Sequence, residues 1–259
     1  MCSCYPAVVL RYRLGWLIAT CLLICGCLSA RAETIAAYTE DLPPYNYTAA
    51  QGQPTGYSVE LLALLMAAAH VDYHVELMPW ARAVSEARHT PGALAFTMAK
   101  TPERAPNFLW IGPIARRNTA ILGLTSHPLS LSSLDDARRF KIGALNGDVG
   151  MEMLLQHGFI AGRNLIVESR RNDLIRLLQN GSIDLIVGNT PAMRHVAARS
   201  GLAGGDLTIR LVLADEEDGY YFALNRNTAP DMVARLQHAW ASLQGTEAVA
   251  ALKRKYAVP

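Results

Sequence analysis

The sequence predicts an α/β fold with two lobes. Between residues 33 and 256, short apolar runs alternate with helical stretches, some amphipathic and some apolar on nearly all sides. A series of strand, helix, strand, helix and strand implies a largely parallel sheet covered by helices. Two such series of similar length follow one another without clear sequence repetition, which suggests two separate α/β units.

The first series occupies residues 33–104. A proline-stiffened loop at 40–45 and a glycine-containing turn at 51–56 interrupt it. The expected strands are 33–38, 72–77 and the apolar run from 93, and the expected helices are 59–69 and 80–88.

The second series occupies residues 131–199, with strand-like segments on either side of it. It opens on a capped turn at 131–135, and two long amphipathic helices at 231–244 and 246–256 close the chain. The expected strands are 119–124, 141–145, 165–168, 183–187 and 218–224, and the expected helices are 149–157, 173–179 and 191–199.

We expect the terminal helices to return to the first unit. The sequence therefore predicts a first lobe formed by residues 33–118 together with 218–259, and a second lobe formed by 119–217. Two strand-like crossings, one at each boundary, would join them.

Residues 1–32 have the pattern of a signal peptide. Arg11 and Arg13 precede an apolar stretch at 14–29, which is short for a membrane span, and small residues surround Arg31 at a predicted cleavage site. This leader predicts export to the periplasm. A lipoprotein is the alternative, because the residues before Cys27 resemble a lipobox and would make Cys27 the acylated residue.

The cysteine content and the net charge of the chain argue against several classes of function. All five cysteines lie in the leader, so disulfides and thiol catalysis are excluded from residues 33–259. That part of the chain has 21 Lys and Arg against 22 Asp and Glu, a net charge of −1. Without a basic surplus or aromatic-basic interleaving, nucleic acid is not an expected partner.

Motifs for catalysis, cofactors and metals are not evident. No Gly-x-Ser-x-Gly elbow, phosphate-binding loop or Cys/His pair is present in the sequence. His70 and His74 have helical spacing, but the residues between them read as the exit from a helix into a strand, so solvated surface is the better interpretation. We expect no cofactor, no metal and no enzymatic activity.

Arg104 is the best candidate for an anchor of a ligand. It follows a short apolar run that ends in hydroxyls and a proline, which places a planar cation at the rim of a predicted sheet. A guanidinium can hold a carboxylate through two parallel hydrogen bonds. A surface salt bridge is the alternative role for an arginine at such a position.

Five short motifs follow one another over residues 33–259. They are Pro44-Tyr45, the Gly-aromatic motif at 56–61, Thr101 to Arg104 with Pro113, the turn at 181–184, and Gly245 with Lys255-Tyr256. In order and spacing they resemble family 3 of the bacterial extracytoplasmic solute-binding proteins, which serve ABC importers of polar amino acids.

The resemblance implies a type II periplasmic-binding-protein-like fold, with a ligand cleft between two α/β lobes joined by two crossing strands. It also implies a monomer that captures a small carboxylate-bearing solute, an amino acid or a related compound, and delivers it to a membrane permease. Two alternatives stay open. One is an enzyme similar to dehydratases of cyclic carboxylic acids, with Asp148 or Glu217 as acid or base. The other is a sensing module for a membrane receptor.

Residue by residue, the resemblance places Arg104 on the ligand's α-carboxylate, Thr97 near it and Trp80 against the cleft wall. Asn146 to Asp148 match a loop at a helix N-terminus that holds the same carboxylate from the second lobe. We therefore expect Arg104→Ala to abolish stabilisation by ligand and to leave the ligand-free melting temperature nearly unchanged.

Departures from the family pattern affect the remaining candidates. Asn189 stands where amino-acid binders usually carry an aspartate for the α-ammonium, so we expect ligands beyond ordinary α-amino acids. Asp148 would more naturally cap its own helix than bind an anion. Tyr38 and Tyr45 flank the proline-rich loop and are candidates for lining the cleft. The acidic pairs at 40–41 and 217–218 could replace the missing aspartate.

Overall fold

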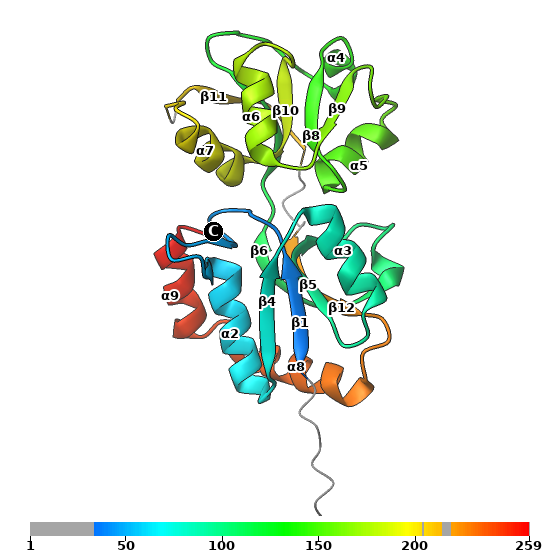
Figure 1. The fold of residues 1–259 in the computed structure, drawn as a ribbon, viewed down its shortest axis with the longest axis vertical. Coiled ribbons are helices and arrows are strands. Elements are labelled where there is room, and N and C mark those ends of the chain that lie inside the picture. Colours follow the sequence, from blue (N-terminus) through cyan, green and yellow to red (C-terminus); the bar gives the residue numbers. More distant parts are fainter. Residues whose placement is uncertain (1–33, 204, 214–218, 259) are drawn as a thin grey trace, which may run out of the picture. The chain divides into compact units, whose positions relative to one another are not determined.

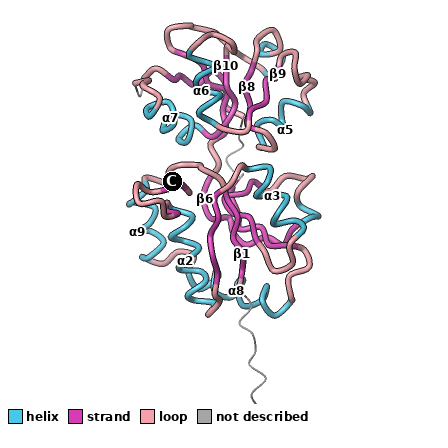
Figure 2. The backbone as a smooth tube through the Cα atoms, in the orientation of Figure 1, coloured by secondary structure: helices cyan, strands magenta, loops and turns pink. Residues whose placement is uncertain are grey.

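The computed structural model describes residues 34–203, 205–213 and 219–258. The predicted leader with Cys27, and the acidic pair at 217–218, lie outside these ranges. Among the described residues, no helix combines the length and apolar character that a membrane span needs. Residues 34–258 hold two five-stranded mixed sheets, labelled in Figure 1, and Figure 2 traces the helices and loops around them.

The first sheet has the strand order β4-β1-β5-β12-β6. Strand β1 pairs in parallel with β4 and β5, whereas β12 is antiparallel to both β5 and β6. The strands are β1 (Ile35–Thr39), β4 (Tyr73–Leu77), β5 (Leu94–Ala99), β6 (Phe108–Arg116) and β12 (Gly219–Asn225).

The second sheet has the order β11-β7-β10-β8-β9. Strands β8, β9 and β10 are parallel, and β7 runs antiparallel between β10 and β11. The strands are β7 (Thr119–Leu124), β8 (Ile142–Leu145), β9 (Leu165–Glu168), β10 (Leu185–Asn189) and β11 (Leu207–Val212). The three strands of each predicted series are parallel to one another, as expected, and the antiparallel pairs involve strands outside the series, β6 and β12 in the first sheet and β7 and β11 in the second.

Helices cover both faces of each sheet. We call the first sheet with its helices the first lobe, and the second sheet with its helices the second lobe. In the first, α2 (Tyr57–Ala69), α8 (Pro230–Leu243) and α9 (Glu247–Tyr256) share one buried cluster, and α3 (Trp80–His89) packs on the opposite face. In the second, the helices are α4 (Leu134–Ala137), α5 (Val149–Gln156), α6 (Arg171–Gln179) and α7 (Thr190–Arg199). A small hairpin of β2 (Tyr47–Thr48) and β3 (Pro54–Thr55), and the 3₁₀ turn η1 (Ala105–Asn107), complete the described elements.

Strand β6 is a long element that the sequence reading did not predict. It contains Gly112 and Pro113, residues that normally mark turns. The pairing register with β12 shifts between Tyr220 and Phe222, opposite this dipeptide. Pro113 cannot donate to the ladder, and the register shift accommodates it there. Strand β6 leads directly into β7, so Arg117 and Asn118 form the crossing between the two sheets.

Gly56 is the N-cap residue just before α2, and its backbone conformation would be strained in any other residue. Its φ is +116°, and a Cβ atom there would lie 2.5 Å from the carbonyl oxygen of Tyr45. We expect Gly56→Ala to lower the free energy of unfolding by about 3 kcal/mol or more. Gly52→Ala is the matched control, because its φ is +83° but no atom lies within 4 Å. Urea unfolding of both variants checks this, and equal losses would contradict it.

Candidate functional site

Arg104 lies in the turn after β5, and its side chain reaches the second lobe. The Nη2 atom donates to the Gly147 carbonyl at 2.8 Å and to Glu152 Oε1 at 2.6 Å, and Nε donates to the same Glu152 oxygen at 3.2 Å. Within its own lobe, Nη1 donates to the Ala99 carbonyl at 3.3 Å. The side chain is only 7% exposed. Arg104 is therefore a buried cation that contacts both lobes.

Trp80 joins Arg104 at the same point. The first residue of α3, Trp80 donates its indole N–H to the Gly147 carbonyl at 2.8 Å, and the Arg104 guanidinium lies 5.7 Å from its ring centroid. The Gly147 carbonyl thus accepts two hydrogen bonds from the first lobe. Glycine suits this position because its φ is +71° and Ala81 lies close by.

The loop from Asn146 to Asp148 differs from the expected anion cradle. Asn146 is exposed, and its backbone N–H donates to the Glu168 carbonyl. Asp148 Oδ1 accepts from the Val149 N–H at 2.7 Å and caps α5, as its sequence position suggested. The loop presents the Gly147 carbonyl to Arg104, so its contact with the first lobe is made by an acceptor.

Thr97 is held in a buried chain of hydrogen bonds. It has a left-handed backbone, φ +59°, and its hydroxyl donates to Asn46 Oδ1 at 2.6 Å. The Asn46 amide in turn donates to the Glu40 carbonyl at 2.6 Å. A β-branched residue with positive φ is strained, and such strain concentrates at functional positions. Thr97 therefore fixes the loop that carries Glu40.

Asn189 forms a polar junction between the two lobes. It ends β10 and caps α7, with its side-chain oxygen accepting from the Ala192 N–H at 3.0 Å. Its amide donates to the Tyr220 hydroxyl of β12 at 3.1 Å. The ring of Tyr45 packs edge-on against Tyr220 at 5.3 Å, and both rings are buried. Burial raises the pKa of the Tyr220 hydroxyl, which stays protonated.

Substitutions of Asn189 test how much its hydrogen bond at the start of α7 contributes to stability. Asn189→Ala removes the cap of α7, and we expect it to lower the free energy of unfolding by about 1 kcal/mol. Asn189→Ser retains a side-chain acceptor for the Ala192 N–H, adds no charge at this 2% exposed position and should cost less. Urea unfolding of the two variants measures this, and the prediction fails if serine is the more costly substitution.

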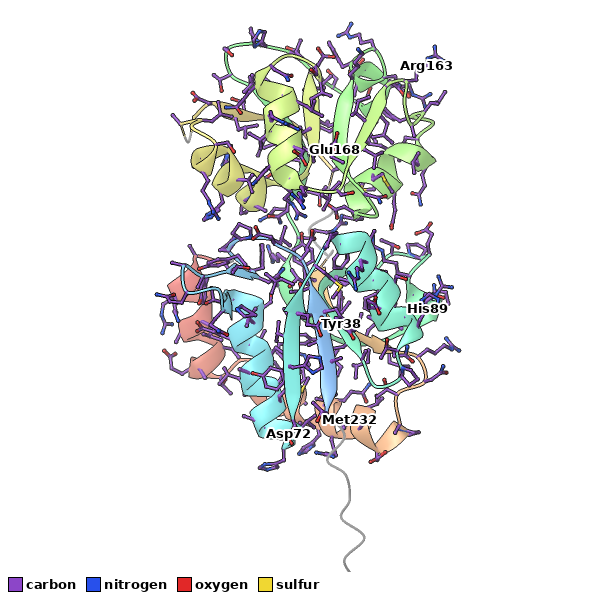
Figure 3. The ribbon with its side chains drawn as sticks, in the orientation of Figure 1. Tyr38, Asp72, His89, Arg163, Glu168 and Met232 are labelled. Atoms are coloured by element: carbon purple, nitrogen blue, oxygen red, sulfur yellow. The ribbon has the colours of Figure 1, made fainter. Side chains whose placement is uncertain are left out.

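Tyr38 lies apart from this group. It is on β1, where Figure 3 labels it, and it packs against the buried hydrophobic cluster that includes Trp80, Ala83 and Ala87 of α3. Burial raises the pKa of its hydroxyl, with smaller contributions from Glu76 and Glu86. The structure therefore brings Arg104 and Trp80 together with the 146–148 loop, gathers Tyr45 and Asn189 around Tyr220, and leaves Tyr38 under a helix.

A second ion pair between the lobes was missed by the sequence reading. Arg171 donates from Nη1 to Glu40 Oε2 at 2.6 Å and from Nη2 to Oε1 at 3.1 Å, and Nη1 also reaches the Asp41 carbonyl at 2.8 Å. The two side chains are 5% and 8% exposed. Burial alone would lower the pKa of Arg171, but the Glu40 carboxylate outweighs burial and the net pKa is raised.

The local sequence held one signal for this pair. Arg170 and Arg171 stand at the start of α6, where the positive end of the helix dipole disfavours cations. Such a local conflict indicates a residue that is held by partners elsewhere.

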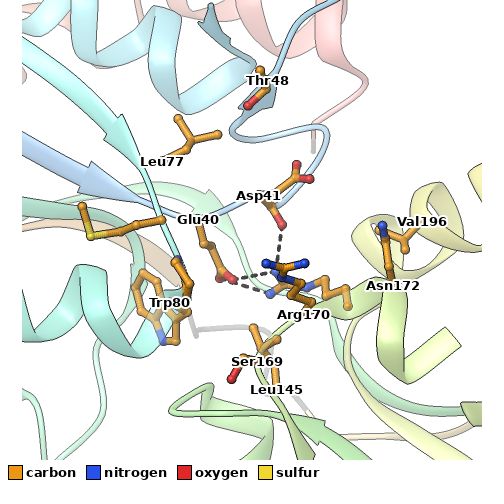
Figure 4. A pocket seen from close by; sticks show the side chains of 13 residues that line it. Glu40, Asp41, Thr48, Leu77, Trp80, Leu145, Ser169, Arg170, Asn172 and Val196 are labelled. Carbon is orange, nitrogen blue, oxygen red and sulfur yellow. Dashed lines mark hydrogen bonds and ion pairs between the residues drawn. The ribbon is translucent and has the colours of Figure 1, made fainter. Parts of the chain in front are cut away.

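Beside the Glu40–Arg171 pair lies a cavity of about 330 Å³, shown in Figure 4. Its size is within the range of small-molecule pockets. Of the residues that the sequence singled out, Trp80 and the acidic pair Glu40 and Asp41 line it. The other lining residues are Thr48, Leu77, Met78, Pro79, Leu145, Ser169, Arg170, Arg171, Asn172 and Val196. Both lobes therefore contribute charged and apolar walls. No three His, Cys, Asp or Glu side chains in the described ranges are grouped to share a metal ion.

The sequence matches the model of a known protein family. The family is the bacterial extracellular solute-binding proteins, family 3, and the match spans residues 35–259, nearly the whole described chain. The chain belongs to this family. No match was found among curated protein sequences.

Solved structures of several proteins share the fold. A histidine kinase sensor domain with similarity to periplasmic binding proteins has a TM-score of 0.78 at 22% identity, covering 88% of this chain and 98% of that one. An ancestral arginine-binding protein bound to arginine has a TM-score of 0.76 at 16% identity, with coverages of 86% and 98%. ArtJ from Geobacillus stearothermophilus, which binds arginine, lysine and histidine, has a TM-score of 0.72 at 18% identity, with coverages of 86% and 94%. The type II periplasmic-binding-protein fold with two α/β lobes predicted from the sequence is therefore confirmed.

Proposed function

We propose that this chain is a periplasmic solute-binding protein for a small carboxylate-bearing solute, an amino acid or a related compound. It would capture the solute by lobe closure and deliver it to the membrane permease of an ABC importer. The observation that carries the proposal is Arg104, a buried cation whose donors reach a carbonyl and a carboxylate of the opposite lobe. An anion bound there would touch both lobes.

The proposed lobes are residues 33–118 with 218–259, and residues 119–217, after a leader that directs export. A hinge at the two crossings would let the lobes open and close as bodies. Trp80 supplies an aromatic wall at the cavity, and Arg170 and Asp41 supply exposed charges of both signs at its rim. This lining suits a solute with an apolar portion and more than one polar group.

A ligand-sensing module for a membrane receptor is the second candidate. The similarity to a histidine kinase sensor domain favours it, because that domain covers 88% of this chain at a TM-score of 0.78. Binding and closure would proceed in the same way in either case. A gene neighbourhood with a permease and an ATPase supports transport, whereas a neighbouring receptor kinase supports sensing.

Binding is favoured over enzymatic turnover. The family and the similar structures are binding proteins, and Asp148 serves as a helix cap. Glu217, the other acid considered for catalysis, lies outside the described residues.

A thermal-shift screen of residues 33–259 tests the proposed function. The panel holds α-amino acids, their decarboxylated amines, and carboxylates that lack an α-amino group. A solute at a hundred times its Kd stabilises the folded state by about 2.7 kcal/mol, or about 5–10 °C for a chain of this size. We expect stabilisation by carboxylates and none by the amines. Stabilisation by amines alone, or by no member of the panel, would contradict the proposal.

The same screen tests whether the lack of a negative charge at Asn189 affects the binding of solutes with an α-ammonium group. The side chain of Asn189 is committed to Ala192 and Tyr220 and carries no charge for an ammonium group. Asn189→Asp should therefore shift the response towards α-amino acids, with Asn189→Ala as the control that adds no charge.

A further inference from the structure

Glu152 occupies the face of Arg104 that points into the second lobe. Glu152 lies in the first turn of α5, and its Oε1 atom accepts from both Arg104 Nε and Nη2, at 3.2 and 2.6 Å. A carboxylate in that turn also gains from the positive end of the helix dipole. Glu152 thus uses both attractions that the cleft offers to an anion, the guanidinium and the helix N-terminus.

The Arg104–Glu152 contact is weaker than the bidentate pair that an arginine and a carboxylate can form. Both Arg104 donors converge on Oε1, whereas a fork-shaped pair would use both oxygens. The other oxygen, Oε2, is buried without a hydrogen-bond partner. A buried carboxylate oxygen without a donor is unfavourable. A carboxylate that presented both oxygens to Arg104 would therefore form the better pair.

The surroundings of Glu152 also disfavour its charge. Burial raises the pKa of its carboxyl, Arg104 opposes the rise, and the nearby acids Asp148 and Glu103 add to it. A second cavity of about 190 Å³ borders Glu152 and the 99–103 segment. It gives the displaced side chain a place to move without unpacking α5.

We propose that Glu152 is an internal carboxylate that occupies the ligand-carboxylate position on Arg104 when no solute is bound. It pairs the two lobes in the ligand-free chain, and a solute must displace it to reach Arg104. Glu152 is then a specificity-determining residue, since only an anion that pairs with Arg104 better than Glu152 does can bind. The inference rests on the proposed function for the ligand role of Arg104.

Chemical rescue by acetate tests this without knowledge of the natural solute. Glu152→Ala leaves a carboxylate-sized space beside Arg104, which free acetate can fill. We expect acetate to raise the melting temperature of Glu152→Ala by several degrees more than that of the unmodified chain. Acetamide at the same concentration, and chloride at the same ionic strength, should not reproduce the effect.

The matched control is Glu103→Ala. Glu103 accepts from Gln156 across the same boundary at 2.7 Å but is hydrogen-bonded to that amide and not to the Arg104 guanidinium. Its variant should respond to acetate as the unmodified chain does, and Arg104→Ala/Glu152→Ala should lose the response. If Glu152→Ala does not fold, Glu152→Gln gives the same readout, because its neutral amide can be displaced by acetate.

An acetate response of the Glu152 variant no larger than that of the unmodified chain would overturn the proposal. A response that survives in the double variant would overturn it too, because the Arg104 guanidinium would then not be the group that binds acetate. The proposed function can fail separately. If no solute in the thermal-shift panel binds but acetate still stabilises Glu152→Ala, the proposal for Glu152 is supported and the proposed function is contradicted.

Discussion

Arg104→Ala is expected to abolish the ligand-induced rise in melting temperature and also to destabilise the ligand-free chain. The substitution removes the donors to Gly147, Ala99 and Glu152 and leaves the Glu152 carboxylate without its countercharge. Removing one partner of a fully buried pair costs about 3–5 kcal/mol. Glu152 is 26% exposed and can be partly solvated, so we expect a loss of about 2–3 kcal/mol.

This corrects the expectation drawn from the sequence, that the loss of Arg104 would leave the melting temperature of the ligand-free protein nearly unchanged. Arg82→Ala is the control, because Arg82 is 68% exposed and pairs with Glu86 on its own helix. It should cost about 0.5 kcal/mol or less. Urea unfolding gives the stabilities, and a ligand-free Arg104→Ala as stable as Arg82→Ala would show that the contacts across the lobes carry no net stability.

Arg171→Ala is expected to have the larger effect on stability. The substitution leaves the Glu40 carboxylate, which is 8% exposed, without its partner. It also removes the donor to the Asp41 carbonyl. An uncompensated buried charge of this kind costs about 3–5 kcal/mol. The paired replacement Glu40→Gln/Arg171→Met should cost less than Arg171→Ala, because it does not leave a buried carboxylate at position 40 without its partner.

Arg176→Ala on the same helix is the matched control for Arg171. Its guanidinium is 72% exposed and pairs with Asp173, so its loss should change the free energy of unfolding by about 0.5 kcal/mol or less. Equal losses for Arg171→Ala and Arg176→Ala in urea unfolding would exclude a structural role for the buried pair.

Local patterns predicted much of the secondary structure. The segments 119–124 and 165–168 coincide with β7 and β9, and the helix expected at 191–199 begins one residue earlier as α7. Each has a clear apolar pattern bounded by polar or turn-forming residues. Strand β6 escaped because Gly112 and Pro113 interrupt its pattern, and its pairing with β12 tolerates that interruption through a register shift.

The site was harder to predict because its contacts join distant parts of the chain. Arg104 and Trp80 could be selected from motifs, but Glu152 lies 48 residues from Arg104 and Glu40 lies 131 residues from Arg171. No local period relates such residues, and a single sequence does not identify which distant residue is the partner. The same holds for Asn189 and Tyr220, whose contact depends on two strands from different sheets.

The most direct test of a carboxylate site on Arg104 is a crystal structure of residues 33–259 with the most stabilising solute from the thermal-shift panel. We expect the solute carboxylate to accept from Arg104 Nε and Nη2, with Glu152 displaced from the guanidinium. A bound solute that leaves the Arg104–Glu152 pair intact would contradict the assignment of Arg104 as the anchor.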